Sequence, residues 1–225
     1  MSVFYRNEKW KRILHLTHLV STLVLYYTGF SWYYPALASS VGGYGNVMLI
    51  HRAAAAVFII VPLYMLVTRR RKVAHFLGEL VHWTFNDNKW MLKFPLYIFK
   101  YKETNMPDFE GKYNPGQKFS SSMQVGLCLL LGISGLIWIL LINYYPQTPQ
   151  FVFEFLSLTH MLGALLLFLL LLGHIYLGAG IFRPYRGILR TMFGDGYIDK
   201  DKAFNIWPRW AEEMERQDDD QEGAT

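Results

Sequence analysis

Two histidines on one long apolar segment are the residues of this chain best placed to do chemistry. His160 and His174 lie within residues 159–183, THMLGALLLFLLLLGHIYLGAGIFR, fourteen positions apart. On an α-helix this spacing is about 21 Å along the axis and about 40° around it. The two imidazoles are therefore expected to face the same way, one near each end of a helix that crosses a membrane.

Two further histidines pair with these when all four are placed by their expected depth in the membrane. His15 begins another apolar segment on the side of His174, and His51 begins a third on the side of His160. Ionisable residues inside a membrane are costly and mark functional sites. Facing neutral imidazoles can hold a metal ion or the iron of a haem. A bare metal site would need further carboxylate or cysteine ligands at the same depth, and the only acidic residue within the spans is Glu154 at the outer edge.

Two haems, each held by two histidines, fit this count best. The chain has one cysteine, Cys128, and no CxxCH motif, so the haems are predicted to be non-covalent, b-type groups. His18 lies three residues beyond His15 and is the alternative ligand, although His15 better matches the depth of His174. A single membrane histidine is more often a hydrogen-bonding core residue, and it is the pairing by depth that favours ligation.

The elements that must position these histidines are four apolar segments. A helix needs about 20 mostly apolar residues to span a bilayer, and the chain is 52% hydrophobic and 17% aromatic. The first segment is too long for a signal-peptide core and ends in SWYYP, with no small-residue cleavage site. We predict an all-α membrane protein, a four-helix transmembrane bundle with spans at residues 13–34, 47–68, 119–143 and 153–181.

The basic residues predict the orientation of the spans. Of 22 Lys and Arg, 21 fall in the N-terminal segment, the connection between spans two and three, or the C-terminal tail. Cytoplasmic segments carry such an excess, so both termini are predicted to be cytoplasmic. This topology accounts for the net charge of +5, and no nucleic-acid partner is expected. Arg52 alone lies on the outer side, where it could neutralise a haem propionate or pair with Glu154.

The remaining segments have distinct predicted characters. The connection 69–118 mixes lysines with aromatic residues around KWMLKFPLYIFKYKE, which favours an interfacial segment between helices two and three, lying at the membrane surface. It ends in GKYNPGQK, residues 111–118, where proline and two glycines predict a turn and make a helix unfavourable. Residues 1–217 are predicted to form a single domain, and the acidic tail 218–225 is predicted to be disordered.

Several motifs together resemble one family. These motifs are RILH in the first span, the histidine that opens the second, GKYNPGQK, the paired histidines and the late PRW. Together they are similar to the cytochrome b (gamma) subunit of formate dehydrogenase-N, a four-helix diheme membrane anchor. The similarity runs from about Lys9 to Glu215. It assigns the histidines to the pairs found by depth, with His51 and His160 on the outer haem and His15 and His174 on the inner one.

The resemblance also implies a quinone site. The family's quinone pocket maps onto Asn114, Gly116 and Gln117, beside His174. Without the resemblance, this segment would be interpreted as a simple turn and helix start. Pro115 departs from the family pattern, which has a small residue there, and it removes one backbone N–H from the proposed contacts.

The resemblance implies a role in respiration at the bacterial inner membrane. The gamma subunit takes electrons from an iron–sulfur (beta) subunit, associated with a molybdenum or tungsten catalytic (alpha) subunit on the outer face. It passes them through two haem b to menaquinone or ubiquinone near the cytoplasm, and the family forms a trimer of heterotrimers. The alternatives are the cytochrome b of a nickel–iron hydrogenase or of a thiosulfate- or polysulfide-reductase complex, and, in another class, a histidine-lined metal-ion transporter.

Overall fold

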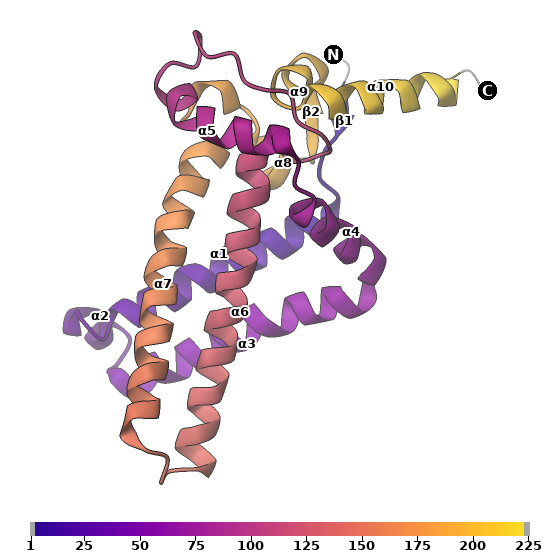
Figure 1. Ribbon diagram of the computed structural model, residues 1–225. Coiled ribbons are helices and arrows are strands. Elements are labelled where there is room, and N and C mark those ends of the chain that lie inside the picture. The colour runs from indigo at the N-terminus through magenta and orange to yellow at the C-terminus, as the bar shows by residue number, and fades with distance from the viewer. Residues whose placement is uncertain (1–2, 223–225) are drawn as a thin grey trace. The chain divides into compact units, whose positions relative to one another are not determined.

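The computed structural model describes residues 3–222 and is mainly helical (Figure 1). Its strands are short and pair with each other in one two-stranded sheet, while the long helices correspond to the apolar segments. The elements in chain order are β1 (Val3–Tyr5), α1 (Lys9–Phe30), α2 (Pro35–Ser40), α3 (Tyr44–Thr68), α4 (Arg70–Val81), α5 (Phe85–Phe99), α6 (Pro115–Tyr144), α7 (Gln150–Gly178), η1 (Arg183–Tyr185), α8 (Leu189–Phe193), β2 (Tyr197–Asp199), α9 (Lys200–Ile206) and α10 (Pro208–Glu222).

Four helices, α1, α3, α6 and α7, are long and apolar enough to cross a membrane. This confirms the four predicted spans, with shifted ends. The first span ends at Phe30, and the aromatic residues that were predicted to close it lie in the turn before α2. The last span ends at Gly178, because Gly180 follows with a φ of 71°, a conformation that favours glycine and ends a helix.

The chain divides into two compact units, each with one pair of long helices. The N-terminal unit comprises residues 5–74 and 191–196. In it α1 packs along α3, and α2 lies in the connection between them. The side chains of Lys72 and Glu8 form an ion pair that ties the start of α4 to the residue preceding α1.

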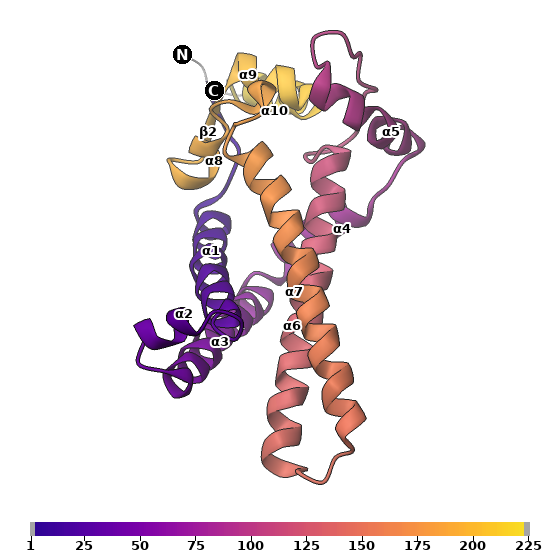
Figure 2. The same cartoon turned by 90° about the vertical axis from the view of Figure 1, so that its left-hand side faces the viewer.

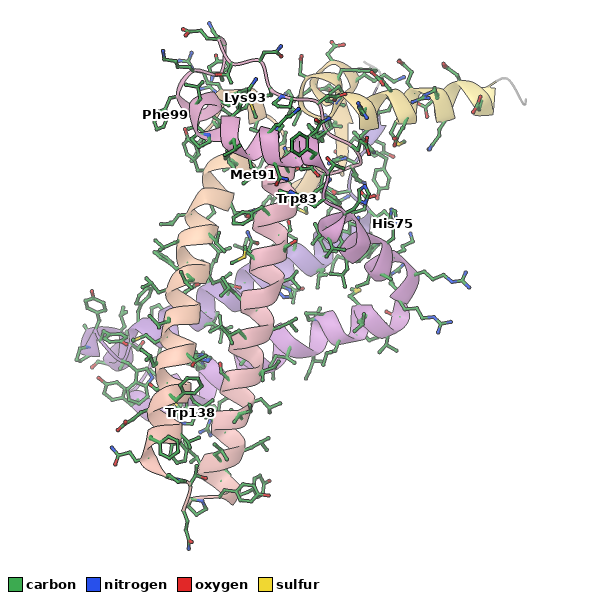
Figure 3. The ribbon with its side chains drawn as sticks, in the orientation of Figure 1. His75, Trp83, Met91, Lys93, Phe99 and Trp138 are labelled. Carbon is green, nitrogen blue, oxygen red and sulfur yellow. The ribbon has the colours of Figure 1, made fainter. Side chains whose placement is uncertain are left out.

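The second unit contains, of the described residues, 3–4, 75–190 and 197–222. Its helices α6 and α7 lie side by side as an antiparallel hairpin, and α5 lies across the end where α6 begins (Figures 1 and 2). Trp138 lies toward the opposite end of α6, while Trp83, Met91, Lys93 and Phe99 cluster around α5 (Figure 3). The predicted interfacial connection thus contains two helices, α4 and α5, of which α5 buries Trp90 and exposes Phe99.

Aromatic side chains from distant parts of the sequence form the core at this end of the second unit. Phe4 of β1 packs against the ring of Trp210 at a centroid distance of 5.9 Å, and Phe182 packs against Tyr185 at 5.7 Å. The buried members of this core are Phe4, Trp90, Phe109, Phe182, Tyr185, Ile188, Ile198, Ala203, Ile206, Trp207, Trp210 and Ala211.

Two local predictions were wrong. The first is the turn expected over residues 111–118, because α6 begins at Pro115. The proline occupies the first helical position, where its missing N–H costs no intrahelical bond, and Asn114 caps the helix. The second is disorder from residue 218: α10 continues to Glu222, and Lys200 lies 3.7 Å from the carboxylates of both Glu215 and Asp218. Residues 223–225 of the predicted tail lie outside the described part.

Candidate functional site

His51 of α3 is held by a hydroxyl from the neighbouring helix of its own unit. Its Nδ1 lies 2.7 Å from Oγ1 of Thr28 in α1, and Thr28 is completely buried. The same hydroxyl lies 2.7 Å from the carbonyl oxygen of Val24 and 3.1 Å from that of Leu25, so it donates its one proton to the backbone of its own helix. With the hydroxyl donating in this way, its oxygen is the acceptor toward His51 in the tautomer that carries the proton on Nδ1.

His160 of α7 has the same arrangement in the other unit. Its Nδ1 lies 2.9 Å from Oγ of Ser134 in α6, and Ser134 is 4% exposed. Ser134 Oγ donates to the carbonyl oxygen of Leu131 at 3.2 Å. A Cβ added to Gly135 would lie 3.4 Å from Cε1 of His160, so the absence of a side chain there lets the ring lie close against α6.

These two rings fit what a haem iron requires. A histidine that binds metal through one nitrogen normally donates its other N–H to a fixed acceptor, which sets the ring orientation. In the tautomer in which Nδ1 of His51 and of His160 donates to the hydroxyl oxygen, Nε2 carries the lone pair that can bind iron. The predicted outer-haem ligands are thus suited to their role, each within its own unit.

The other predicted ligands lie on the same helices. His15 packs edge-on against Phe193 with ring centroids 5.4 Å apart, whereas His18 packs against the buried Phe58 of α3 at 4.7 Å. His18 therefore faces the interior of the α1–α3 pair, which favours His15 as the ligand. His174 is exposed on α7, and a Cβ added to Gly178 one turn later would lie 4.0 Å from its Nε2.

The predicted quinone residues form the first turn of α6. Asn114 Oδ1 accepts a hydrogen bond from the backbone N–H of Gln117 at 2.9 Å, and Gln117 Oε1 accepts one from the N–H of Asn114 at 3.1 Å. This reciprocal pair is a capping box. Asn114 Nδ2 also donates to Tyr185 Oη at 2.9 Å, and Trp207 Nε1 donates to Gln117 Oε1 at 2.9 Å. Lys112 Nζ also lies 5.6 Å from the ring centroid of Trp210, so two of the motifs that carried the resemblance, GKYNPGQK and PRW, are adjacent in space.

Helix α5 is fixed to this turn by contacts that the sequence did not predict. Lys118 Nζ bonds Asp87 Oδ2 at 3.0 Å and the carbonyl oxygen of His82 at 3.1 Å. Trp90, one turn beyond Asp87, covers Gly116: a Cβ there would lie 3.1 Å from the indole. The sequence contains one signal of this contact, a lysine in the motif GKYNPGQK at the start of an otherwise apolar helix.

A cavity of about 210 Å³ lies beside this turn. Its walls include Trp90, Tyr97, Asn114 and Tyr185, while Gly116 and Gln117 do not line it. Burial and the neighbouring Tyr101 raise the pKa of Tyr97, so its hydroxyl keeps its proton at neutral pH. Of the three predicted quinone residues in this turn, only Asn114 lines the cavity.

The remaining predicted residues lie on the surface. Arg52 is exposed on α3, and Glu154 accepts a hydrogen bond from Gln150 Nε2 at 2.7 Å. His75, labelled in Figure 3, and His82 lie outside the long apolar helices and are exposed.

Comparison with known families agrees with this site. A family model described as prokaryotic cytochrome b561 matches residues 6–195, which include all four long helices and all four predicted ligands. The chain belongs to the prokaryotic cytochrome b561 family. A search of curated proteins finds no match.

Membership of the cytochrome b561 family confirms the coarser part of the predictions. The chain is a multi-pass membrane protein of the cytochrome b type that transfers electrons and binds haem b. Such a haem would supply one-electron redox chemistry, and His51 and His160 remain candidate ligands, each hydrogen-bonded within its own unit.

Proposed function

We propose that this cytochrome b561 is the membrane-anchoring diheme subunit of a formate dehydrogenase-type complex. It takes electrons from an iron–sulfur subunit on the outer face and delivers them through two haem b to a quinone near the cytoplasmic side. The observation that carries the proposal is that His51 and His160 make matching hydrogen bonds to buried hydroxyls. The sequence assigns both histidines to the same membrane depth, and such a bond orients an imidazole for iron ligation. His15 and His174 hold the inner haem in this proposal, and Arg52 serves an outer-haem propionate.

The chain's own residues fix the distance that electrons travel. His160 and His174 lie on one uninterrupted helix, α7, so the axial ligands of the two centres keep a constant spacing of about 21 Å along that helix. Reduction of a quinone consumes two electrons and two protons. When the electrons arrive from the outer face and the protons from the cytoplasm, each turnover transfers charge across the membrane.

The first turn of α6 supplies the quinone contact in this proposal. Gln117 Oε1 accepts hydrogen bonds from two donors, the N–H of Asn114 and Nε1 of Trp207, which orients the amide. Among residues 3–222 no hydrogen bond involves Gln117 Nε2. This group remains as a donor for a quinone oxygen, while Asn114 keeps the turn in shape and Gly116 leaves room for Trp90.

The variant Gln117→Glu tests this contact sharply. A glutamate keeps the acceptor oxygen for Asn114 and Trp207 but replaces the Nε2 donor with a second acceptor. We expect slower oxidation of the dithionite-reduced haems by menadione, a menaquinone analogue, with unchanged haem content. Gln124→Glu, at a half-buried position farther along α6, is the matched control. Oxidation of the Gln117→Glu haems at the wild-type rate would contradict the quinone contact.

The electron donor is tested in native membranes containing the tagged chain. Formate should reduce its haems in the absence of added mediators, whereas hydrogen should not, and the iron–sulfur and molybdenum or tungsten subunits should co-purify with it. Cross-linking of the purified complex tests the trimer of heterotrimers. Reduction by hydrogen alone would assign the chain to a hydrogenase instead, and a colourless protein would favour the transporter alternative.

A further inference from the structure

Two buried hydroxyl groups occupy equivalent places in the two units. Thr28 lies on α1 and bonds the histidine of α3, and Ser134 lies on α6 and bonds the histidine of α7. Each hydroxyl also donates to a carbonyl oxygen three or four residues earlier in its own helix. Their exposed fractions are 0% and 4%, so water does not compete for either bond.

The direction of each bond determines what the histidine can do. A hydroxyl has one proton, which goes to the helix backbone, and two lone pairs. With that proton on the helix carbonyl, Nδ1 of the ring is the donor; in the other tautomer the hydroxyl would turn away from the carbonyl and donate to Nδ1. With Nδ1 as the donor, the ring keeps its lone pair on Nε2, the nitrogen that would bind a metal.

We propose that Thr28 and Ser134 are positioning residues that orient the outer-haem ligands and set the midpoint potential of that haem. The inference rests on the proposed function, because it assumes that His51 and His160 bind iron. An imidazole that donates through Nδ1 is a more basic ligand through Nε2. A more basic ligand stabilises the oxidised iron relative to the reduced iron, so both hydroxyls lower the potential of the haem.

Each bond forms within one unit, between two helices that pack along each other. The ring orientation is therefore set by the α1–α3 pair in one case and by the α6–α7 hairpin in the other, independently of haem. Loss of the group that accepts the hydrogen bond of a metal-binding histidine typically weakens metal binding by about 10- to 100-fold. We expect the same range for retention of the outer haem when either hydroxyl is removed.

The test uses the full chain purified in detergent. Thr28→Val keeps the shape of the side chain and removes the acceptor, Ser134→Ala does the same on α6, and Thr28→Ser restores the hydroxyl. Ser21→Ala is the matched control, because Ser21 is a buried α1 hydroxyl that bonds the carbonyls of Thr17 and His18 and no imidazole ring. The readouts are haem content by pyridine haemochrome, spectroelectrochemical titration, and the low-spin EPR signals of the oxidised haems.

In Thr28→Val and Ser134→Ala we expect one of the two haem potentials to rise and one EPR signal to shift, or that haem alone to be lost. Thr28→Ser and Ser21→Ala should match the wild type. Wild-type potentials and EPR signals in both Thr28→Val and Ser134→Ala would overturn the inference while leaving the proposed function intact. Absence of haem from the wild-type protein would instead overturn the proposed function itself.

Discussion

Lys118 Nζ lies 3.0 Å from Asp87 Oδ2, and the two side chains are 1% and 0% exposed. This ion pair joins the first turn of α5 to the first turn of α6. Oδ2 of Asp87 also accepts the N–H of Thr84, while Oδ1 is buried and has no partner among the described residues. Burying both charges costs more than a surface pair would, so the pair specifies where α5 docks more than it stabilises the chain.

Removing one member of this pair should destabilise the protein strongly. Asp87→Ala leaves the Lys118 charge buried and uncompensated, which costs about 3–5 kcal/mol in the free energy of unfolding. Asp108→Ala, which breaks the exposed pair with Arg209, should cost less than about 1 kcal/mol. Chemical unfolding of the purified protein in detergent measures both. Equal effects for the two variants would show that the buried pair does not hold α5.

A branched side chain at Gly116 should destabilise the protein. A Cβ there would lie 3.1 Å from Trp90, so Gly116→Val overpacks the contact between α5 and α6 and should cost about 1–3 kcal/mol. The fluorescence of the displaced indole should change as well. Gly126→Val, at an α6 position with no atom within 4 Å of an added Cβ, is the control. Unchanged stability and fluorescence in Gly116→Val would contradict the docking of Trp90.

The stability of the second unit should fall in alkaline solution. Burial, with a contribution from Tyr97, raises the pKa of Tyr185 far above its usual range, although the hydrogen bond from Asn114 lowers it. Above pH about 10 the unfolded chain loses this proton while the folded chain keeps it, so the free energy of unfolding decreases as the pH rises. Unfolding titrations between pH 9 and 11 should show a shallower decrease for Tyr185→Phe than for the wild type, and an unchanged one for Tyr145→Phe, at an exposed position.

Much of the membrane region could be predicted from the sequence. Apolar segments of about 20 residues indicate spanning helices. The prediction that His160 and His174 lie on one helix is confirmed, because α7 is unbroken. The ends of helices were less predictable. Pro115 was interpreted as a helix breaker, yet at the first position of α6 it fits a helix, and only the cap formed by Asn114 and Gln117 makes this clear.

The contacts that shape the candidate sites could not be read from sequence patterns. Thr28 and Ser134 are single hydroxyls in apolar helices, and their bonds to His51 and His160 depend on how neighbouring helices pack. The docking of Trp207 on Gln117 joins segments ninety residues apart. Such pairings follow from tertiary packing, which local periodicity does not encode.

The most direct test of the account is the haem content of the purified chain and of its histidine variants. Pyridine haemochrome should give two haem b per wild-type chain, with a low-spin spectrum after reduction. His174→Ala should retain one haem and lose electron transfer to quinone. His51→Ala should also retain one haem, whose potential should differ from that of the haem kept by His174→Ala. A wild-type protein with no haem, or loss of neither haem in both variants, would contradict the ligand assignment.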